Sequence, residues 1–168
     1  MDFYSIVYGA VLHMIDLVLW ITGMRPTEVN AFGNKIATEN TPLRYDSFAS
    51  IQMKFEDCTV GKVTGNGGGV HPHFHRLAVF GTKKTAIHDI TGAKWLSTSD
   101  PNADFTDIVE DYPAKEKRGE VISSFVDYIL NDNIPPIVPT NDVFDGMSVC
   151  FAAEKAMQTN SNVKVEYI

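Results

Sequence analysis

The most constraining feature of the sequence is a helix predicted over Tyr8–Thr22, which is apolar on nearly every side. A helix that is hydrophobic all round is covered on all sides in a globular protein. Gly23 supplies its stop, and Pro26 prevents its continuation. The segment is shorter than the roughly 20 apolar residues of a membrane span, and it lacks the basic lead-in of a signal peptide. We therefore expect a buried helix in a cytoplasmic protein without membrane contact.

Two ionisable residues interrupt this helix. His13 and Asp16 are three positions apart, so they share one face. A polar group buried in an apolar helix costs roughly 1–3 kcal/mol unless it is satisfied. The pair can satisfy itself or bond to nearby backbone. Alternatively, a His at the end of a substrate cleft can act as a general acid or base near neutral pH. The pattern leaves both interpretations open.

The middle of the chain has the alternating pattern of strands. The clearest candidate is Ser47–Phe55, where Ala49, Ile51, Met53 and Phe55 fall on one face. Further strands are predicted at Glu28–Ala37, Thr59–Thr64, His71–Phe80, Thr85–Asp89 and Ala93–Ser97. The segment Ser99–Pro113 is acidic and turn-rich, which indicates a surface loop.

Helical spacing returns near the C-terminus. A helix is predicted over Lys115–Leu130, and a last helix capped by Thr140 or Asn141 extends to Met157. The chain closes with a short strand pattern over Val163–Ile168.

Hairpin-linked strands followed by helices predict an α+β fold, with an open, predominantly antiparallel sheet and helices packed on one face. No G-x-G-x-x-G motif follows a strand, so we expect no Rossmann unit in residues 1–168, which suit one domain.

Charge and cysteine content narrow the functional classes. The formal net charge of −7 argues against a nucleic-acid partner, because phosphate contacts need clustered Lys and Arg. Cys58 and Cys150 lie outside any C-x-x-C motif. The simplest interpretation is a reduced, cytosolic protein with inert thiols.

Three histidines form a second candidate site. In a strand, His71, His73 and His75 would point to the same side. Three imidazoles on one face can bind zinc or another transition metal. However, Pro72 can interrupt the strand, and no fourth ligand is evident. Binding of sugar hydroxyls and simple surface exposure are the alternatives.

The order of these motifs resembles the glucose–fructose oxidoreductase / inositol dehydrogenase / MocA (Gfo/Idh/MocA) family. In that family a helix of the type D-x-G-x-H-x-x-D-x-x-x-W-x-x-G follows the coenzyme domain, and His13, Asp16, Trp20 and Gly23 match it in identity and spacing. The segment Pro26–Ala31 is similar to the family's first strand. Phe80–Lys83 is similar to its F-G-T-K turn, and Pro139–Ile168 to its closing helix and strand.

The resemblance implies that coenzyme binding and substrate binding belong to separate domains. In the family, an N-terminal Rossmann domain binds NAD or NADP, and a C-terminal α+β domain supplies the substrate site. This chain resembles the second part alone, so the coenzyme would be bound by a domain absent from it. The resemblance assigns His13 as the catalytic residue that assists proton transfer from the substrate hydroxyl. We add Asp16, His73 and His75 as candidate substrate-binding residues, and we assign no metal ligand.

Several departures from the family pattern leave three hypotheses. The family often has Asp four residues before the His, where this chain has Gly9, and the motif's Gly is Val11 here. The E-K-P motif of the family's catalytic Lys is absent. The first hypothesis is the substrate-binding part of an NAD(P)-dependent oxidoreductase acting on a sugar, nucleotide sugar or polyol. The second is a non-catalytic sugar-binding or assembly module of the same fold, and the third is a metal-binding protein that uses the three histidines. We also expect a homo-oligomer that associates through the sheet face.

Overall fold

The apolar N-terminal segment forms a helix in the computed structural model, which describes residues 4–109, 117–131 and 134–168. A π-helical turn, η1 (Val7–Val11), leads directly into α1 (Leu12–Thr22). Gly23 ends α1 in a left-handed conformation with φ 64°, and its N–H donates to the Leu19 carbonyl at 2.8 Å. Glycine adopts this conformation without the steric strain that a Cβ would add. The stop predicted from the sequence is therefore confirmed.

The strands form two four-stranded antiparallel sheets. The first sheet has the order β3-β2-β1-β8, and the second has the order β4-β5-β6-β7. Every strand pair in the described residues is antiparallel. The strands of the first sheet are β1 (Glu28–Asn34), β2 (Phe48–Lys54), β3 (Val60–Asn66) and β8 (Val163–Lys164). Those of the second are β4 (Leu77–Phe80), β5 (Thr85–Asp89), β6 (Gly92–Leu96) and β7 (Thr106–Ile108). The predicted open antiparallel α+β fold is thus confirmed.

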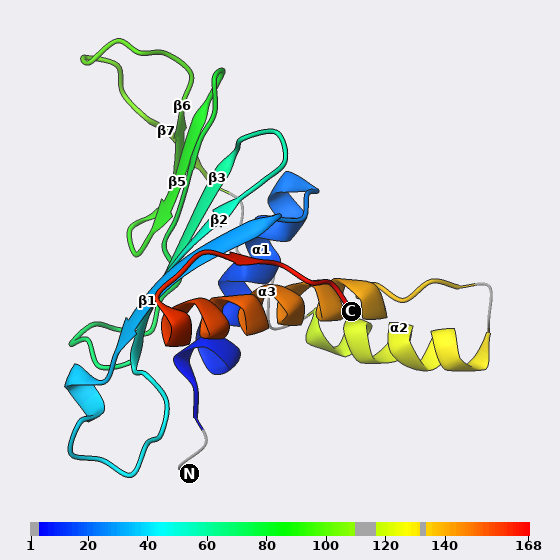
Figure 1. Cartoon of the computed structure of the whole chain (residues 1–168). Helices are drawn as coiled ribbons and strands as arrows, with labels where there is room; N and C mark the ends of the chain where they lie inside the picture. The colour runs from blue at the N-terminus through cyan, green and yellow to red at the C-terminus, as the bar shows by residue number, and fades with distance from the viewer. Residues whose placement is uncertain (1–3, 110–116, 132–133) are drawn as a thin grey trace. The chain divides into compact units, whose positions relative to one another are not determined.

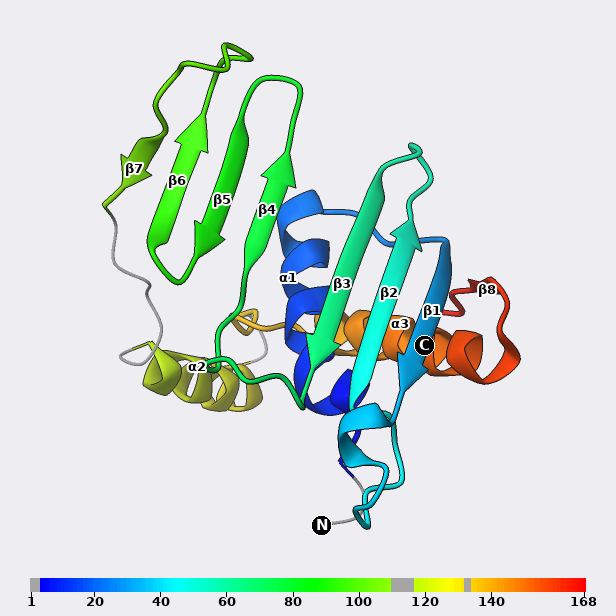
Figure 2. The same ribbon diagram turned by 90° about the vertical axis from the view of Figure 1, so that its left-hand side faces the viewer.

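The core lies between one face of the first sheet and the helices η1, α1 and α3 (Thr140–Thr159) (Figures 1 and 2). The alternation predicted for β2 is confirmed, because four side chains are at most 1% exposed: Ala49, Ile51, Met53 and Phe55. Ile15 of α1 is fully buried on the same side. Gly65 of β3 permits a close approach, since a Cβ there would collide with Val11.

The opposite face of the first sheet is mostly polar. Its members include Asn30, Ser50, Gln52, Lys62 and Thr64, interspersed with an exposed Phe32. A sheet with one covered and one wet face has this alternation. Any self-association through this outer face would therefore form a largely polar interface.

The chain divides into two compact units, Met1–Gly69 with Val121–Ile168, and Val70–Glu120. The second unit contains the second sheet. Its strands have half-exposed side chains, and Lys84 lies over the Trp95 ring at 3.3 Å from the centroid. The single domain over 1–168 remains a prediction.

Helix α2 (Arg118–Leu130) confirms the predicted helix from Arg118 onward, and the earlier part of that prediction lies outside the described residues. Its apolar stripe is exposed: Ile122, Phe125, Val126 and Ile129. None of the helices in the described segments has the length and apolar character that crossing a bilayer demands.

Three local predictions are wrong. Residues 71–76 are bends and irregular backbone, and the strand begins only at Leu77, because Pro72 has no N–H to donate to a ladder. The predicted loop over Ser99–Pro113 contains β7. The last helix has Pro139 at its N-cap without a side-chain cap, in place of the predicted Thr140 or Asn141.

Candidate functional site

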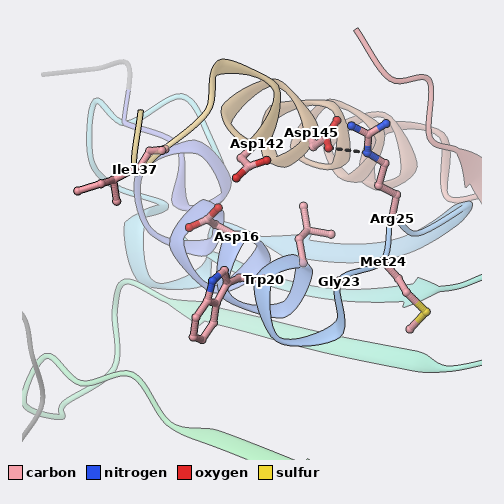
Figure 3. Close-up of a pocket in the computed structure, with 10 residues that line it drawn as sticks. Asp16, Trp20, Gly23, Met24, Arg25, Ile137, Asp142 and Asp145 are labelled. Carbon is pink, nitrogen blue, oxygen red and sulfur yellow. Dashed lines mark hydrogen bonds and ion pairs between the residues drawn. The ribbon is translucent and has the colours of Figure 1, made fainter. Parts of the chain in front are cut away.

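A groove of about 560 Å³ opens in the first unit beside α1. Its walls come from the C-terminal half of α1, the turn that follows, and the segment that enters α3 (Figure 3). The lining combines apolar side chains with four charged ones: Asp16, Leu19, Trp20, Gly23, Met24, Arg25, Ile137, Val138, Asp142 and Asp145. A concave, mixed surface with a few convergent polar groups is typical of small-molecule sites.

The face of α1 that borders the groove is open. Asp16 and His13 are both exposed, and the Trp20 side chain is 79% exposed. The expectation that α1 is covered on every side is therefore wrong for the described chain. The sheet and α3 cover only the side that carries Ile15, so the helix has one buried and one exposed face. His13 and Asp16 therefore do not incur the full cost of a buried polar pair, although partial burial still acts on the Asp16 carboxyl.

The structure brings His13 and Asp16 together, as their spacing predicts. Burial raises the pKa of the Asp16 carboxyl, the negative charge of Asp142 raises it further, and His13 opposes both effects. The Asp16 carboxyl is therefore influenced in opposite directions by Asp142 of α3 and by His13 of its own helix.

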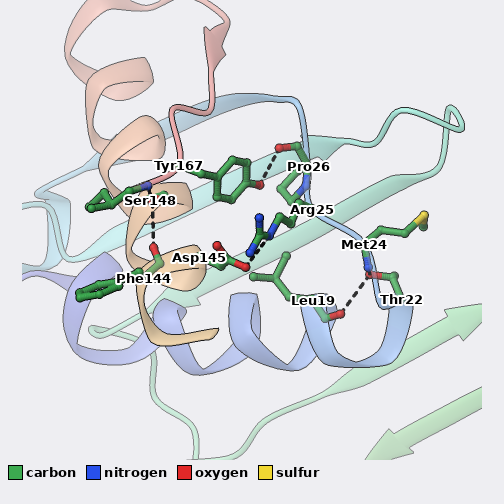
Figure 4. A network of polar contacts seen from close by, with 10 residues as sticks. Leu19, Thr22, Met24, Arg25, Pro26, Phe144, Asp145, Ser148 and Tyr167 are labelled. Carbon is green, nitrogen blue, oxygen red and sulfur yellow. Dashed lines mark hydrogen bonds and ion pairs between the residues drawn. The ribbon is translucent and has the colours of Figure 1, made fainter. Parts of the chain in front are cut away.

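A polar network fixes the far wall of the groove (Figure 4). Arg25 Nε donates to Asp145 Oδ2 at 2.5 Å, and the guanidinium lies 5.2 Å from the centroid of the Tyr167 ring. The Tyr167 hydroxyl donates to the Pro26 carbonyl at 2.7 Å. Because Arg25 is half-exposed, the ion pair contributes at most about 1 kcal/mol. Its main consequence is geometric, since it ties the turn after α1 to α3.

The other predicted site residues lie in the second unit. The rings of His73 and His75 contact each other edge to face, with centroids 5.1 Å apart. His71 Nδ1 instead bonds to the Pro72 carbonyl at 2.7 Å. The three imidazoles do not line one face of a strand, and the described residues hold no group of three His, Cys, Asp or Glu side chains that could bind a metal ion. The metal-binding hypothesis therefore has no geometric support.

The buried cysteine has the environment of an inert thiol. Cys150 of α3 is fully buried, and burial raises the pKa of its thiol to about 12. The thiolate is the reactive form of cysteine, so this side chain is unreactive near neutral pH. The prediction of an inert Cys150 agrees with this geometry.

The comparison with known families identifies the chain. Residues 5–87 match the model of the GFO/IDH/MocA C-terminal domain. This region of the chain belongs to the Gfo/Idh/MocA C-terminal domain family. The matched Gfo/Idh/MocA region includes α1 with His13 and Asp16, the first three strands of the first sheet, and the start of the second sheet. No curated protein sequence matches the chain significantly.

Solved structures share the fold of this Gfo/Idh/MocA chain at low identity. The aldose-aldose oxidoreductase from Caulobacter crescentus, complexed with glycerol, is 16% identical with a TM-score of 0.73, over 92% of this chain and 45% of that one. The UDP-N-acetylglucosamine 3-dehydrogenase GnnA from Acidithiobacillus ferrooxidans is 16% identical with a TM-score of 0.72, over 92% and 48%. The WlbA dehydrogenase from Bordetella pertussis, in complex with NADH and UDP-GlcNAcA, is 10% identical with a TM-score of 0.70, over 98% and 47%. The chain spans about half the length of each.

Sequence reasoning missed three charged residues of the groove in this Gfo/Idh/MocA domain. Arg25 and Asp145 are 120 positions apart, and Asp142 lies in the first turn of a distant helix. No local pattern links such positions. Trp20 belongs to the helix motif, but its exposure in the groove was not predictable from an apolar run.

Replacing Asp16 with Asn should stabilise the domain at neutral pH. The folded state raises the pKa of this carboxyl, so its ionisation destabilises the fold. The penalty is complete above the folded-state pKa and vanishes below the unfolded value of about 4. We expect the midpoint of thermal unfolding to rise by about 1–2 °C at pH 7. At pH 3 the difference should disappear, and circular dichroism at both pH values checks it. An equal gain at both values would contradict the titration as its cause.

Proposed function

We propose that the chain is the substrate-binding half of an oxidoreductase that acts on a hydroxyl group of a sugar, nucleotide sugar or polyol. The observation that carries this proposal is the position of His13 and Asp16. Both side chains are exposed on α1, and Asp16, three residues after His13, lines the groove together with Trp20. Membership of the Gfo/Idh/MocA family supports the reaction class, and the names of the similar enzymes support the substrate class.

Each residue has a role in this proposal. His13 accepts the proton of the substrate hydroxyl as a general base, the role that histidine side chains most often have in proton transfer. Asp16 accepts hydrogen bonds from substrate hydroxyls, because an ionised carboxylate is purely an acceptor. Trp20 offers a flat apolar surface to the carbon face of a ring. His73 and His75 remain predicted substrate contacts.

The coenzyme would be held elsewhere. NAD or NADP would accept the hydride that leaves the substrate carbon. The described residues do not fit this coenzyme, because their strands pair only antiparallel and contain no β-α-β unit with a phosphate-binding turn. We therefore assign the coenzyme to a separate domain, which the length of the similar enzymes supports. Self-association through the outer sheet face also remains a prediction.

A non-catalytic sugar-binding or assembly module is the second candidate function. Gly9 occupies the position where the family often has an acidic residue, and this substitution favours that alternative. Both candidates predict that the groove binds a sugar. They differ in turnover once a coenzyme-binding half is present.

Tryptophan fluorescence tests sugar binding directly. The chain has two tryptophans, Trp20 in the groove and Trp95 in the second sheet. In the Trp95→Phe variant the signal comes from Trp20 alone, so we expect a saturable change with myo-inositol or D-glucose. The dissociation constant should lie in the range of about 1 µM to 1 mM that is usual for substrates. No response to either probe would contradict the proposed substrate class. Binding detected by calorimetry without a change in Trp20 would place the ligand outside the groove.

A further inference from the structure

Two carboxylates face the groove without an ion-pair partner within the described residues. Asp16 extends from α1 and Asp142 from the first turn of α3, and both carboxylates point into the same space (Figure 3). Asp145 differs, because it accepts a bond from Arg25 and Arg25 commits its Nε to that pair. Within the described residues, neither Asp16 nor Asp142 has an ion pair or a hydrogen bond to another side chain. The groove therefore contains two carboxylates that no described side chain bonds to, so a ligand there competes only with water.

This arrangement opposes folding. Two titratable groups act on Asp16: His13 from its own helix and Asp142 from α3, while Arg25 and Asp145 line the same groove. The pKa of Asp16 is raised by burial and then by Asp142, so the ionised pair is destabilising. The first-turn position of Asp142 gives it a favourable interaction with the α3 dipole. Asp16 lies in the middle of α1, so no helix dipole stabilises its negative charge in the same way. Unfavourable charge pairs in clefts are typical of functional sites.

We propose that Asp142 is a substrate-contacting residue that works with Asp16 as a carboxylate pair, each accepting hydrogen bonds from neighbouring hydroxyl groups of a sugar or polyol ring. This inference rests on the proposed function. Adjacent hydroxyls supply the donors that the two carboxylates lack, and such charge-assisted bonds are about twice as strong as neutral ones. The exposed Trp20 ring can then cover the carbon face of the same ligand.

The charge of the groove sets its specificity. Three aspartates against one arginine leave the lining net negative, and Asp145 already engages that arginine. A phosphate group placed there would meet two uncompensated carboxylates. The groove should therefore bind an uncharged polyol or sugar ring and reject a phosphorylated one. If the substrate is a nucleotide sugar, its sugar ring rather than its phosphates would occupy this groove.

Carboxyl-detected NMR of the full chain tests the pair. With ¹³C-labelled aspartate, myo-inositol should shift the side-chain signals of Asp16 and Asp142 together, and D-glucose 6-phosphate should shift neither. Asp142→Asn should weaken myo-inositol binding at least tenfold, as loss of a hydrogen bond to a charged group implies. Asp104→Asn, at an exposed aspartate of the second unit, should leave the affinity unchanged.

The outcomes separate this inference from the proposed function. If myo-inositol binds while the Asp142 signal stays in place and Asp142→Asn keeps the affinity, Asp142 is excluded and the proposed function stands. If neither myo-inositol nor D-glucose perturbs any signal of the wild-type chain, both proposals fall. Tighter binding of the phosphorylated sugar would overturn the charge argument. The wild-type carboxyl shifts decide the matter even if Asp142→Asn does not fold.

Discussion

Replacing His13 with Ala should slow oxidation of the substrate hydroxyl by about a hundredfold in an assembly that contains this chain and its coenzyme-binding half. The imidazole is exposed on α1, three residues before Asp16, which lines the groove. Its removal takes away the proton acceptor that this chain is proposed to supply. The rate of nicotinamide reduction in single-turnover experiments with saturating substrate measures the effect.

The design of this experiment separates proton transfer from binding. His13→Gln keeps a hydrogen-bonding side chain but cannot accept the proton, so its rate should fall to a similar level. His71→Ala is a matched control, because His71 is an exposed histidine whose Nδ1 bonds only to the neighbouring Pro72 carbonyl among the contacts described. Substrate affinity should change little in all three variants. An unchanged rate in His13→Ala would remove this residue from the mechanism.

Replacing Ile15 with Ala should lower the free energy of unfolding by about 2–5 kcal/mol, the range for large-to-small substitutions in a core. Ile15 is fully buried on the covered face of α1, two residues after His13. The matched control is Ile122→Ala on α2, where the side chain is 68% exposed and the change should stay within about 0.5 kcal/mol. Urea denaturation followed by circular dichroism measures both.

This pair of variants tests which side of α1 is covered. Equal effects of the two substitutions would show that Ile15 is not packed as described. The open face that carries His13 and Asp16 would then also be in question. A large effect at Ile15 alone supports the placement of the site on the face away from the core.

The sequence was most informative where apolar residues recur with a single period, either the two-residue period of a strand or the period of a helix. In β2 the alternation of Ala49, Ile51, Met53 and Phe55 predicted four side chains that the structure buries almost completely. The hydrophobic effect acts on each of these positions separately, so a local pattern is sufficient. The order of helices and strands was therefore predictable except for β7, although the boundaries shifted by a few residues.

Prediction failed where the outcome depends on distant parts of the chain. In the apolar run of α1 only His13 and Asp16 mark the exposed side, and the pattern predicted these two polar residues to be buried, so the exposure of Trp20 was not inferred. The pairing of Arg25 with Asp145 is set by the packing of α3 against the start of the chain. At His71–Arg76, the spacing of the histidines by two suggested a strand. The segment is irregular instead, because Pro72 has no N–H to donate to a neighbouring strand.

Tyr167 and Ile168 make contacts that hold neighbouring segments of the fold in place. The Tyr167 hydroxyl holds the Pro26 carbonyl, its ring supports the Arg25 guanidinium, and the N–H of Ile168 donates to Ser148 Oγ at 3.3 Å. The last two residues thus brace the turn that forms one wall of the groove. Removing these residues, or joining a tag directly to Ile168, would therefore disturb the wall of the groove.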